Sequence, residues 1–600
     1  MGKRYYIVYN PVTYNLMDSL GSCKTPLELL GYISNRNPEE LKEETYLDFL
    51  DFDPRKEKMG MVETFAVESY AIIYIGNQVA RLEPDARVIL SDGLRNNIRD
   101  LIMANGKPEA VFISSMSSNF PTSVCTAIAL NVARIPVVIG GIHVSTSGHD
   151  VDLFIRKYVP YPEIVSYVRG GGDSDVMGLV MRDLKKGALK PSYTGYKMIE
   201  DKVWGRTNVE VMPPMKMNFL RRFPLVGNMM AEKIRINPTA PYLGCPHSCS
   251  FCSISSLPKD IRRFTMRSAD DFVNEIENIQ KGGVTLQNSL FFFLPDNIIL
   301  GGKRLEEMLD RIIERKPKIN YMVQISIEVA DNDNLLRKLR LSGASHFFIG
   351  FESLDIRSLK AVGKNVAKDI EKSGKSVRDY YSERIRKIQR HGIVIHGAFI
   401  LGLPYDYFNS IYDNSGHDYG KFCVEHHIGI QATPLSDLPG SRDFIESQAV
   451  GRYLFAKNGT MDYLISLVVC DLAEGNRIPP EQLKKSPLIV LHMAYEAINH
   501  VGQARSVFRS AFYMMWKSFM YPTINGRRSF LDRINDMFVG FAAPLIVSQY
   551  KDHAEKVLSS HSEIRGSIER LYDMEKDPAV KKQFTCYVRG FIKRPGTARP

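Results

Sequence analysis

The residues most able to do chemistry are three cysteines in the run Cys245-Pro-His-Ser-Cys249-Ser-Phe-Cys252. A cubic 4Fe-4S cluster that is fully held by protein takes four thiolates. Three thiolates with no fourth nearby would hold three irons and leave one iron open to a small molecule with an amine and a carboxylate. The alternative is a zinc knuckle, but zinc sites usually pair CxxC with a second ligand pair, and His247 lies inside the loop rather than at ligand spacing.

The run from Gly244 to Ser253 resembles the CxxxCxxC signature of the radical S-adenosylmethionine (SAM) superfamily, including the aromatic residue before the third cysteine. The resemblance implies that Cys245, Cys249 and Cys252 ligate a 4Fe-4S cluster. It further implies that SAM chelates the open iron.

Length, composition and cysteine content indicate what kind of protein carries this site. The chain has 600 residues, 44% of them hydrophobic, which predicts several folded domains with sizeable cores. Eight cysteines suit a reducing compartment. The sequence shows no apolar signal region and no apolar stretch of about 20 residues, so we expect a cytoplasmic protein without a transmembrane segment, while peripheral membrane contact stays open.

The net charge of +11 is scattered along the chain. This distribution favours a solvated basic surface over nucleic-acid binding.

Residues 1–195 are predicted to form an α/β domain. Short apolar strands are expected at 5–9, 86–90, 110–113, 135–139 and 163–168, with helices between them that include 120–133 and 176–185. Strands that alternate with helices predict a parallel sheet, which binds ligands at the carboxyl ends of its strands. Each predicted strand ends in Gly, Ser, Asn or Asp, and glycines in particular permit close backbone approach to a ligand.

Two motifs in this domain are similar to the cobalamin-binding domain that precedes many radical SAM domains. Pro136–His143 matches its GGxH pattern, and Val168–Asp173 resembles its GEGE pattern with Gly171 and Asp173 in place of the glutamates. The resemblance implies a Rossmann-like (flavodoxin-like) fold that binds cobalamin. The residues it places at the cofactor are Ser114, Ser115, Gly140, Gly141, His143, Gly170, Gly171 and Gly172.

The DxHxxG motif, whose histidine ligates cobalt in corrinoid mutases, is absent from this domain. We therefore expect His143 to be a loop residue bonded to backbone rather than a cobalt ligand. The alternative for the whole domain is a flavodoxin-like fold without its cofactor. The segment from Cys23 to Met61 is an acidic insertion that the pattern does not place.

Residues 196–235 are predicted to be a linker, and residues 236–445 a second α/β unit. Six strands are expected at 239–243, 289–294, 321–327, 346–351, 394–401 and 428–432. Six such repeats fit the partial (β/α)6 barrel of the radical SAM superfamily. Barrel enzymes place their chemistry at the carboxyl ends of strands.

Polar residues leave these strands where the family has its conserved elements. Asp296-Asn297, Gln324 to Glu328 and Glu352 follow the second, third and fourth strands, and Gln431 to Ser441 resembles the TPLPGT segment that closes the barrel. By resemblance, Glu352 binds the ribose or methionine part of SAM, Ser326 or Gln324 binds the ribose hydroxyls, and Gly397 to Gly402 contact adenine. Glu328 and Glu352 are the candidate catalytic acids, with a buried structural ion pair as the alternative. The acid expected after the fifth strand is missing, because Pro404 and Tyr405 follow it.

Residues 446–600 are predicted to be helical. Leu488 to Met520 carries Met493, Ile498, Phe508, Phe512, Met515 and Trp516 at helical spacing. Such a stripe usually lies in a core, and a substrate pocket or a membrane surface are the alternatives.

The succession of motifs resembles cobalamin-dependent radical SAM C-methyltransferases. The resemblance implies that a 5′-deoxyadenosyl radical activates a substrate carbon and that methylcobalamin donates the methyl group, with the protein positioning both cofactors. Cyclisation, ring contraction or oxidation with the same cofactors is the runner-up. Expected partners are a small-molecule or peptide substrate and a reductant such as flavodoxin or ferredoxin.

Two other classes fit less well. RNA methylthiolation enzymes place three more cluster cysteines in their N-terminal domain, where this chain has only Cys23 and Cys125. A corrinoid carrier would not need a SAM-binding barrel. The remaining Cys423, Cys470 and Cys586 lack cluster spacing and are expected to be buried thiols.

Overall fold

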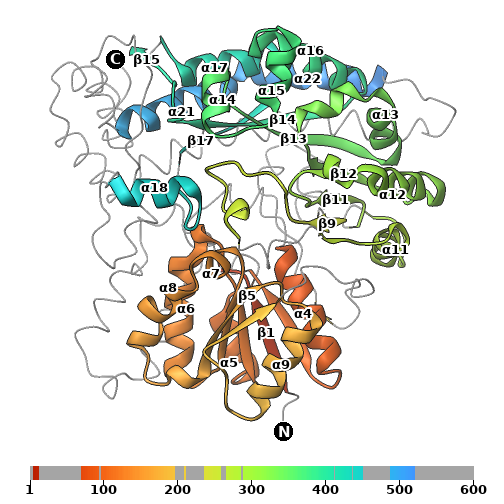
Figure 1. Cartoon of the computed structure of the whole chain (residues 1–600). Helices are drawn as coiled ribbons and strands as arrows, with labels where there is room; N and C mark the ends of the chain where they lie inside the picture. Colours follow the sequence, from red (N-terminus) through yellow and green to blue (C-terminus); the bar gives the residue numbers. More distant parts are fainter. Residues whose placement is uncertain are drawn as a thin grey trace, which may run out of the picture.

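The structure is a computed structural model that describes residues 4–11, 69–92, 96–195, 209–210, 235–257, 265–285, 288–410, 413–435, 437–450 and 487–520. Two parallel sheets flanked by helices dominate these residues, one N-terminal and one central (Figure 1). The acidic insertion, Cys23, Cys470, Cys586 and most of the predicted linker lie outside the described residues.

The N-terminal sheet has the strand order β6-β5-β4-β3-β1-β2-β7 and is parallel throughout. Its strands are β1 (Tyr5–Tyr9), β2 (Arg87–Ser91), β3 (Ala110–Ser114), β4 (Val137–Gly140), β5 (Val165–Gly170), β6 (Ser192–Gly195) and β7 (Val209–Glu210). The central order 2-1-3-4-5 is that of flavodoxin-like folds, in which ligands bind where the order reverses, here between β1 and β3. The five predicted strands are confirmed to within two residues. The edge strands β6 and β7 were not predicted, and β7 lies in the stretch predicted as a linker.

Helices cover both faces of this sheet. One face packs against α5 (Ile98–Asn105), α6 (Phe120–Val132), α7 (Ile142–Ser147) and α8 (His149–Phe154). The other face packs against α4 (Tyr70–Leu82) and α9 (Ser174–Lys185). The inner strands β1, β3 and β4 are largely apolar on both sides, as is typical of parallel strands buried between helices.

The central sheet has the order β17-β14-β13-β12-β11-β8 and is also parallel. Its strands are β8 (Ile236–Thr239), β11 (Leu290–Phe293), β12 (Asn320–Gln324), β13 (Ala344–Glu352), β14 (Val394–Leu401) and β17 (Gly429–Pro434). The stretch predicted for the first strand lies mostly C-terminal to β8. The other five predicted strands are present, β14 with the predicted bounds and the remaining four with shifted ends. Each strand neighbours the next one along the chain, which is the topology of a partial (β/α)6 barrel.

Two predicted strand assignments were wrong at their ends. The first barrel strand ends at Thr239, and Tyr242–Leu243 forms a separate strand, β9, that pairs antiparallel with β10 (Thr265–Met266). Ile327 lies in a 3-10 helix, η9 (Ile327–Asp331), so Glu328 follows β12 rather than closing it. In both places the apolar run continues past the last residue that pairs with a neighbouring strand of the central sheet.

The barrel helices are α11 (Ala269–Ile279), α12 (Gly302–Arg315), α13 (Asp333–Ser342), α14 (Ile356–Ala361), α15 (Val366–Ser373), α16 (Val377–Arg390), α17 (Ser415–Glu425) and α18 (Arg442–Val450). Several begin at side-chain caps: Ser268, Asn332 and Ser376 each accept a hydrogen bond from the backbone N–H three residues later. A single apolar cluster joins helices α11 through α17 to the outer side of the strands, whereas α18 contributes no residue to it.

The predicted C-terminal helix is divided into α21 (Pro487–Gly502) and α22 (Ala504–Met520). On α21, Met493 and Ile498 are buried, as expected for a core stripe. On α22 the prediction was wrong for Phe508, Phe512 and Trp516, which are 50–58% exposed. Among the described helices, none combines the length and apolar character needed to cross a bilayer.

The two sheets meet through a small apolar cluster. Tyr70 and Tyr74 of α4 pack against Ala240, which follows β8, together with Leu243 and Leu294. Helix α7 directly follows β4 and lies on the side of the N-terminal domain that faces the barrel (Figure 1). The carboxyl edge of the N-terminal sheet therefore faces the barrel.

Gly141 gives a test of this edge. It has a φ of +106°, and a Cβ added there would lie 2.3 Å from the Ser115 carbonyl oxygen. We predict that Gly141→Ala weakens local stability by on the order of 2–4 kcal/mol. At Gly140 an added Cβ meets nothing within 4 Å, so Gly140→Ala should change stability by less than about 0.5 kcal/mol.

Amide hydrogen exchange in β3 and β4 measures this difference locally, which suits a chain of several domains. Equal protection in the two variants would contradict the close approach of Gly141 to Ser115.

Candidate functional site

The cysteine loop leaves the barrel after β9 and folds back on itself. Cys245, Cys249 and Cys252 are not joined in disulfides, and each is partly exposed. The Ser255 hydroxyl donates to the carbonyl oxygens of Cys249 (2.9 Å) and Cys252 (2.6 Å). Burial raises the pKa of the Cys245 thiol, and the other two thiols add to that rise, so the three sulfurs lie close enough to interact.

Neighbouring segments fix the position of this loop. The Ser250 N–H donates to the Val362 carbonyl (3.1 Å), and the Asn365 amide donates to His247 Nδ1 (2.7 Å). On another side, the Ser250 hydroxyl donates to Asp443 of α18 (3.0 Å). The loop is therefore held between the α14–α15 connection and α18.

An ion pair at the end of β13 lies beside the cysteines. Glu352 is 7% exposed and accepts a hydrogen bond from Lys364 Nζ at 2.6 Å. Burial raises the pKa of the Cys249 thiol, whereas the Lys364 charge lowers it. Gly350 makes room for the pair, since a Cβ there would lie 2.4 Å from Glu352 Oε1. The cation is thus placed to offset negative charge on the thiolates.

The Glu352 backbone is strained. Its φ of +62° lies in the left-handed region, and the pairing of β13 with β14 shifts register at this point. A glutamate in this conformation costs roughly 1–3 kcal/mol and persists where surrounding contacts hold it, often at functional sites.

Polar groups at the ends of β11 and β12 face the same edge. The Asp296 carboxylate accepts from the Gly244 N–H (3.1 Å), next to Cys245, and burial raises the pKa of Asp296 to about 6. Asn297 and Ser326 form two hydrogen bonds of 3.1 Å, one in each direction. Ser326, predicted to bind ribose, is therefore fixed by a neighbour in this structure.

Glu328 carries a buried oxygen, Oε2, for which the structure shows no hydrogen-bond partner. Leaving a buried acceptor unsatisfied costs about 1–3 kcal/mol. Its charge acts on Lys364, so the two groups share one region of the barrel. An orphan acceptor at the strand ends is a position where a ligand could donate a hydrogen bond.

The less buried residues of β13 and β14 alternate along each strand and face away from the helices. They include His346 and Phe348 on β13 and His396 on β14, whose ring stacks on Phe348 at 5.3 Å. Burial lowers the pKa of both histidines to about 4, so both rings are neutral at pH 7. Gln324 pairs with Phe348 in register and belongs to the same layer.

Gly397 lies on the opposite, helix-facing side of β14. A Cβ there would lie 2.9 Å from two ring carbons of Phe351. The structure thus gives Gly397, predicted to contact adenine, a packing role on the outer side of the sheet.

The loop after β14 holds an acid that the sequence reasoning missed. Asp406 Oδ2 accepts from the N–H groups of Gly402 (2.7 Å) and Leu403 (3.1 Å), and Oδ1 accepts from the Tyr419 hydroxyl (2.6 Å). Gly402 has a φ of +93°, and the hydrogen bonds fix this turn. A carboxyl is therefore present one residue after Tyr405, where it fixes the turn.

Glycines line the carboxyl edge of the N-terminal sheet. Gly141 approaches the Ser115 backbone, and the Gly170 N–H donates to the Ser145 hydroxyl (3.0 Å). Gly171 lies close to the edge strand β6, because a Cβ added to Gly195 would overlap the Gly171 carbonyl oxygen. Gly172 lies against the side chain of Ile75. Gly140 opens onto space free of protein atoms within 4 Å of its absent Cβ. Ser114 ends β3 beside Gly140.

His143 is buried at the start of α7. Its Nδ1 pairs with the Ser117 hydroxyl (3.2 Å), its Nε2 pairs with Asp150 (3.1 Å), and its ring stacks on Phe120 at 3.9 Å. The prediction of backbone partners was wrong, because both ring nitrogens bind side chains. His143 holds the loop after β3 against α7 and α8.

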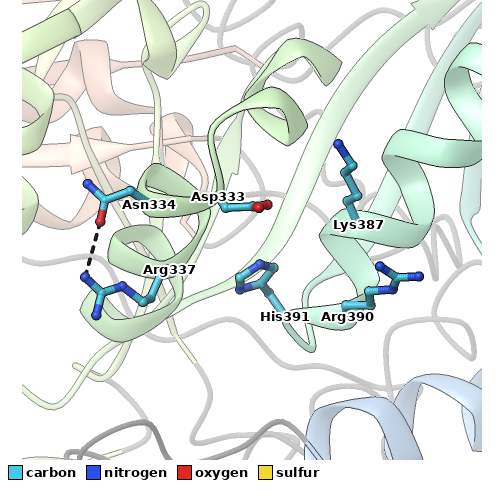
Figure 2. Close-up of a pocket in the computed structure, with 6 residues that line it drawn as sticks. All are labelled: Asp333, Asn334, Arg337, Lys387, Arg390 and His391. Carbon is cyan, nitrogen blue, oxygen red and sulfur yellow. Dashed lines mark hydrogen bonds between the residues drawn. The ribbon is translucent and has the colours of Figure 1, made fainter.

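A depression of about 470 Å³ lies away from the cysteine loop, between α13 and the end of α16 (Figure 2). It is mainly basic and contains none of the predicted site residues. Its lining residues are Asp333, Asn334, Arg337, Lys387, Arg390 and His391.

Comparison with known proteins identifies the central unit. Residues 239–413 match the radical SAM superfamily. These residues are a radical SAM domain. The chain is also 26% identical over 163 residues to the anaerobic magnesium-protoporphyrin IX monomethyl ester cyclase of Rubrivivax gelatinosus, a match that covers 27% of this chain and 26% of that protein. The matched part therefore spans about a quarter of the cyclase.

Solved structures extend the similarity to both sheets. The radical SAM methyltransferase TsrM from Kitasatospora setae, with cobalamin and a 4Fe-4S cluster bound, has a TM-score of 0.52 at 13% identity over 90% of this chain and 100% of its own. The cobalamin-dependent SAM radical enzyme OxsB, with aqua-cobalamin and SAM bound, has a TM-score of 0.50 at 12% identity over 99% of this chain and 82% of its own. The radical SAM domain thus lies within the fold of the cobalamin-dependent members of its superfamily.

The carboxyl of Asp406, in the turn after β14 of the radical SAM domain, should change its protonation state near neutral pH. Burial raises the pKa of Asp406 to about 7. A carboxyl whose folded pKa exceeds its unfolded pKa stabilises the fold at low pH, and this contribution is lost as the pH rises through the folded pKa. Asp406→Asn stays neutral, so the stability of the wild type relative to this variant should fall by on the order of 2–3 kcal/mol between pH 5 and 8.

Thermal unfolding of both proteins across this pH range is the measurement. The exposed Asp369, whose ion pair with Lys372 is long at 3.9 Å, gives the control variant Asp369→Asn. If the unfolding temperatures of the wild type and of Asp406→Asn change in parallel with pH, then Asp406 is ionised over the whole pH range and the prediction is wrong.

Proposed function

We propose that this protein is a cobalamin-dependent radical SAM enzyme that methylates a carbon atom of its substrate. The observation that carries the proposal is that the mouth of the barrel and the carboxyl edge of the N-terminal sheet face each other. Three thiols, the Glu352–Lys364 pair and the orphan oxygen of Glu328 lie at one edge. The glycine-rich carboxyl edge of a flavodoxin-like sheet faces it.

The cysteine loop fits a 4Fe-4S cluster. Cys245, Cys249 and Cys252 would be its three protein ligands, and the described residues near the loop offer no fourth thiol. The Lys364 ammonium would reduce the electrostatic cost of negative charge on the sulfurs. Ser255 would hold the loop shape through its two hydrogen bonds.

The neighbouring strand ends fit SAM. Glu328 Oε2 would accept a hydrogen bond from the ligand and so satisfy its lone pairs. Glu352, paired with Lys364, would bind the ribose or methionine part, and Gln324 and Ser326 would lie near the ribose hydroxyls. Asp406 would preserve the turn at Gly402 beside the adenine.

The glycine edge fits the face of a corrinoid. Gly140 leaves open space, and Gly170 to Gly172 bring main chain rather than side chains to the edge. Ser114 and Ser115 would contact the ligand from β3, and His143 would act as a positioning residue, because both its ring nitrogens are already engaged.

When bound, SAM at the cluster supplies a carbon-centred radical that removes hydrogen from unactivated carbon, and cobalamin supplies the methyl group. The protein's share is orientation and exclusion of water. The neutral rings of His346 and His396 can donate or accept hydrogen bonds to a small-molecule or peptide substrate without adding charge. The electron would come from an external reductant such as a flavodoxin or ferredoxin.

A second candidate is a cyclisation or another non-methylating radical reaction with the same cofactors. The similarity to the anaerobic cyclase favours it. The two candidates share every residue assignment above and differ only in the fate of the substrate radical.

Loss of one cluster ligand tests the enzyme assignment. We predict that Cys249→Ala lowers iron after anaerobic reconstitution from about four per chain to near background and abolishes SAM cleavage. Cys423→Ala is the matched control, because Cys423 is fully buried in the barrel core and should leave iron content unchanged. Equal iron in the two variants would rule out the cluster at this loop.

Corrinoid stoichiometry tests the second cofactor. After reconstitution with hydroxocobalamin and gel filtration, we expect about one corrinoid per chain in the wild type, and less in both Gly140→Ala and Gly141→Ala. With SAM labelled by a CD3 group, a substrate product heavier by that group supports methylation. An unlabelled, cyclised or oxidised product supports the second candidate, and iron without corrinoid eliminates both.

A further inference from the structure

Three side chains able to bind a metal meet away from the barrel mouth. His417 lies on α17, and Glu496 and His500 lie on α21, which packs against α17 (Figure 1). One ligand atom of each residue lies within 4.8 Å of the other two, and all three side chains are half-buried. Glu496 and His500 are four residues apart and so share one face of their helix.

Close packing of the two helices creates this juxtaposition. Gly416 and Gly420 flank His417 on α17, and both lie directly against α21. A Cβ on Gly416 would lie 1.9 Å from the Met493 carbonyl oxygen, and one on Gly420 would lie 2.7 Å from His500 Cβ. The absence of these side chains lets His500 reach His417.

The donor atoms of the three side chains suit zinc. Neutral imidazoles with one carboxylate match the His2Glu set of zinc sites.

We propose that His417, Glu496 and His500 bind one zinc ion, with a water or another small ligand at the fourth position. His500 Nε2 and His417 Nδ1 are 2.6 Å apart. Two nitrogens on one tetrahedral zinc are about 3.3 Å apart, given Zn–N bonds of roughly 2.0 Å. Entry of the ion therefore requires the rings to separate by under about 1 Å, which a side-chain rotation achieves.

The bound ion would clamp α21 to the helix that precedes β17. It lies outside the SAM and corrinoid sites assigned above, and its presence does not depend on the proposed function. A site of this kind fixes the C-terminal helical segment on the barrel, because ligands from two segments about 80 residues apart bind one centre.

Zinc content is the primary test. The full-length chain is stripped with chelator, loaded with Zn²⁺, desalted and analysed by mass spectrometry for zinc per chain. Zinc held by the cysteine loop is identified with Cys249→Ala. We expect about one zinc that persists in Cys249→Ala and is lost in His500→Ala and Glu496→Gln.

His427→Gln is the matched control. His427 is also a half-buried histidine after α17, and it contacts α22 through Ser510 (3.2 Å) and Tyr513 but is not among the three ligands. It should retain the zinc. Glu496→Gln preserves the shape of the side chain. If this variant folds and holds as much zinc as the wild type, the proposal is overturned.

Two further readouts address the geometry. Co²⁺ in place of Zn²⁺ in corrinoid-free protein should give the visible bands of four-coordinate cobalt in Cys249→Ala but not in Cys249→Ala/Glu496→Gln. Added Zn²⁺ should raise the thermal midpoint of Cys249→Ala and leave that of the double variant unchanged. A midpoint that responds equally in both proteins also overturns the proposal.

Discussion

The structure at the barrel mouth depends on one ion pair. Buried Glu352 is held in the left-handed region at the end of β13, with the partly buried Lys364 at 2.6 Å. A glutamate backbone in this conformation costs roughly 1–3 kcal/mol and persists only where surrounding contacts hold it. The ion pair with Lys364 is such a contact. Burial raises the pKa of Cys249 and the same lysine opposes that rise, which ties the strand end to the cysteine loop.

This arrangement explains why the loop needs so many neighbours. The α14–α15 connection supplies Lys364 and accepts from Ser250 through Val362, while α18 binds Ser250 from the other side. Elements about 110 and 190 residues later along the chain thus position three cysteines that lie within eight residues of sequence. The shape of the loop therefore depends on contacts with distant parts of the barrel.

The sequence predicted features that have a short-range signal. Apolar runs of four to eight residues located the inner strands of the N-terminal sheet and the later barrel strands, because buried parallel strands are apolar on both faces. The edge strands β6 and β7 were not predicted, since they are short and two of the four residues of β6 are exposed. The role of Asp406 was not predicted, because it binds backbone N–H groups of a turn whose shape cannot be read from the sequence Gly-Leu-Pro.

The predicted site residues divide in the same way. Glu352 and the cysteines could be read from local motifs, but the partner of Glu352 is twelve residues away, and the orphan state of Glu328 depends on packing around η9. His143 carried a glycine-flanked motif that suggested a loop, yet its partners come from Ser117 and Asp150. The group of His417, Glu496 and His500 had no sequence signal, because only the contact made possible by Gly416 and Gly420 brings α21 to α17. Local pattern therefore identifies the ligands that share one loop, whereas sites that join distant helices become visible only when the packing is known.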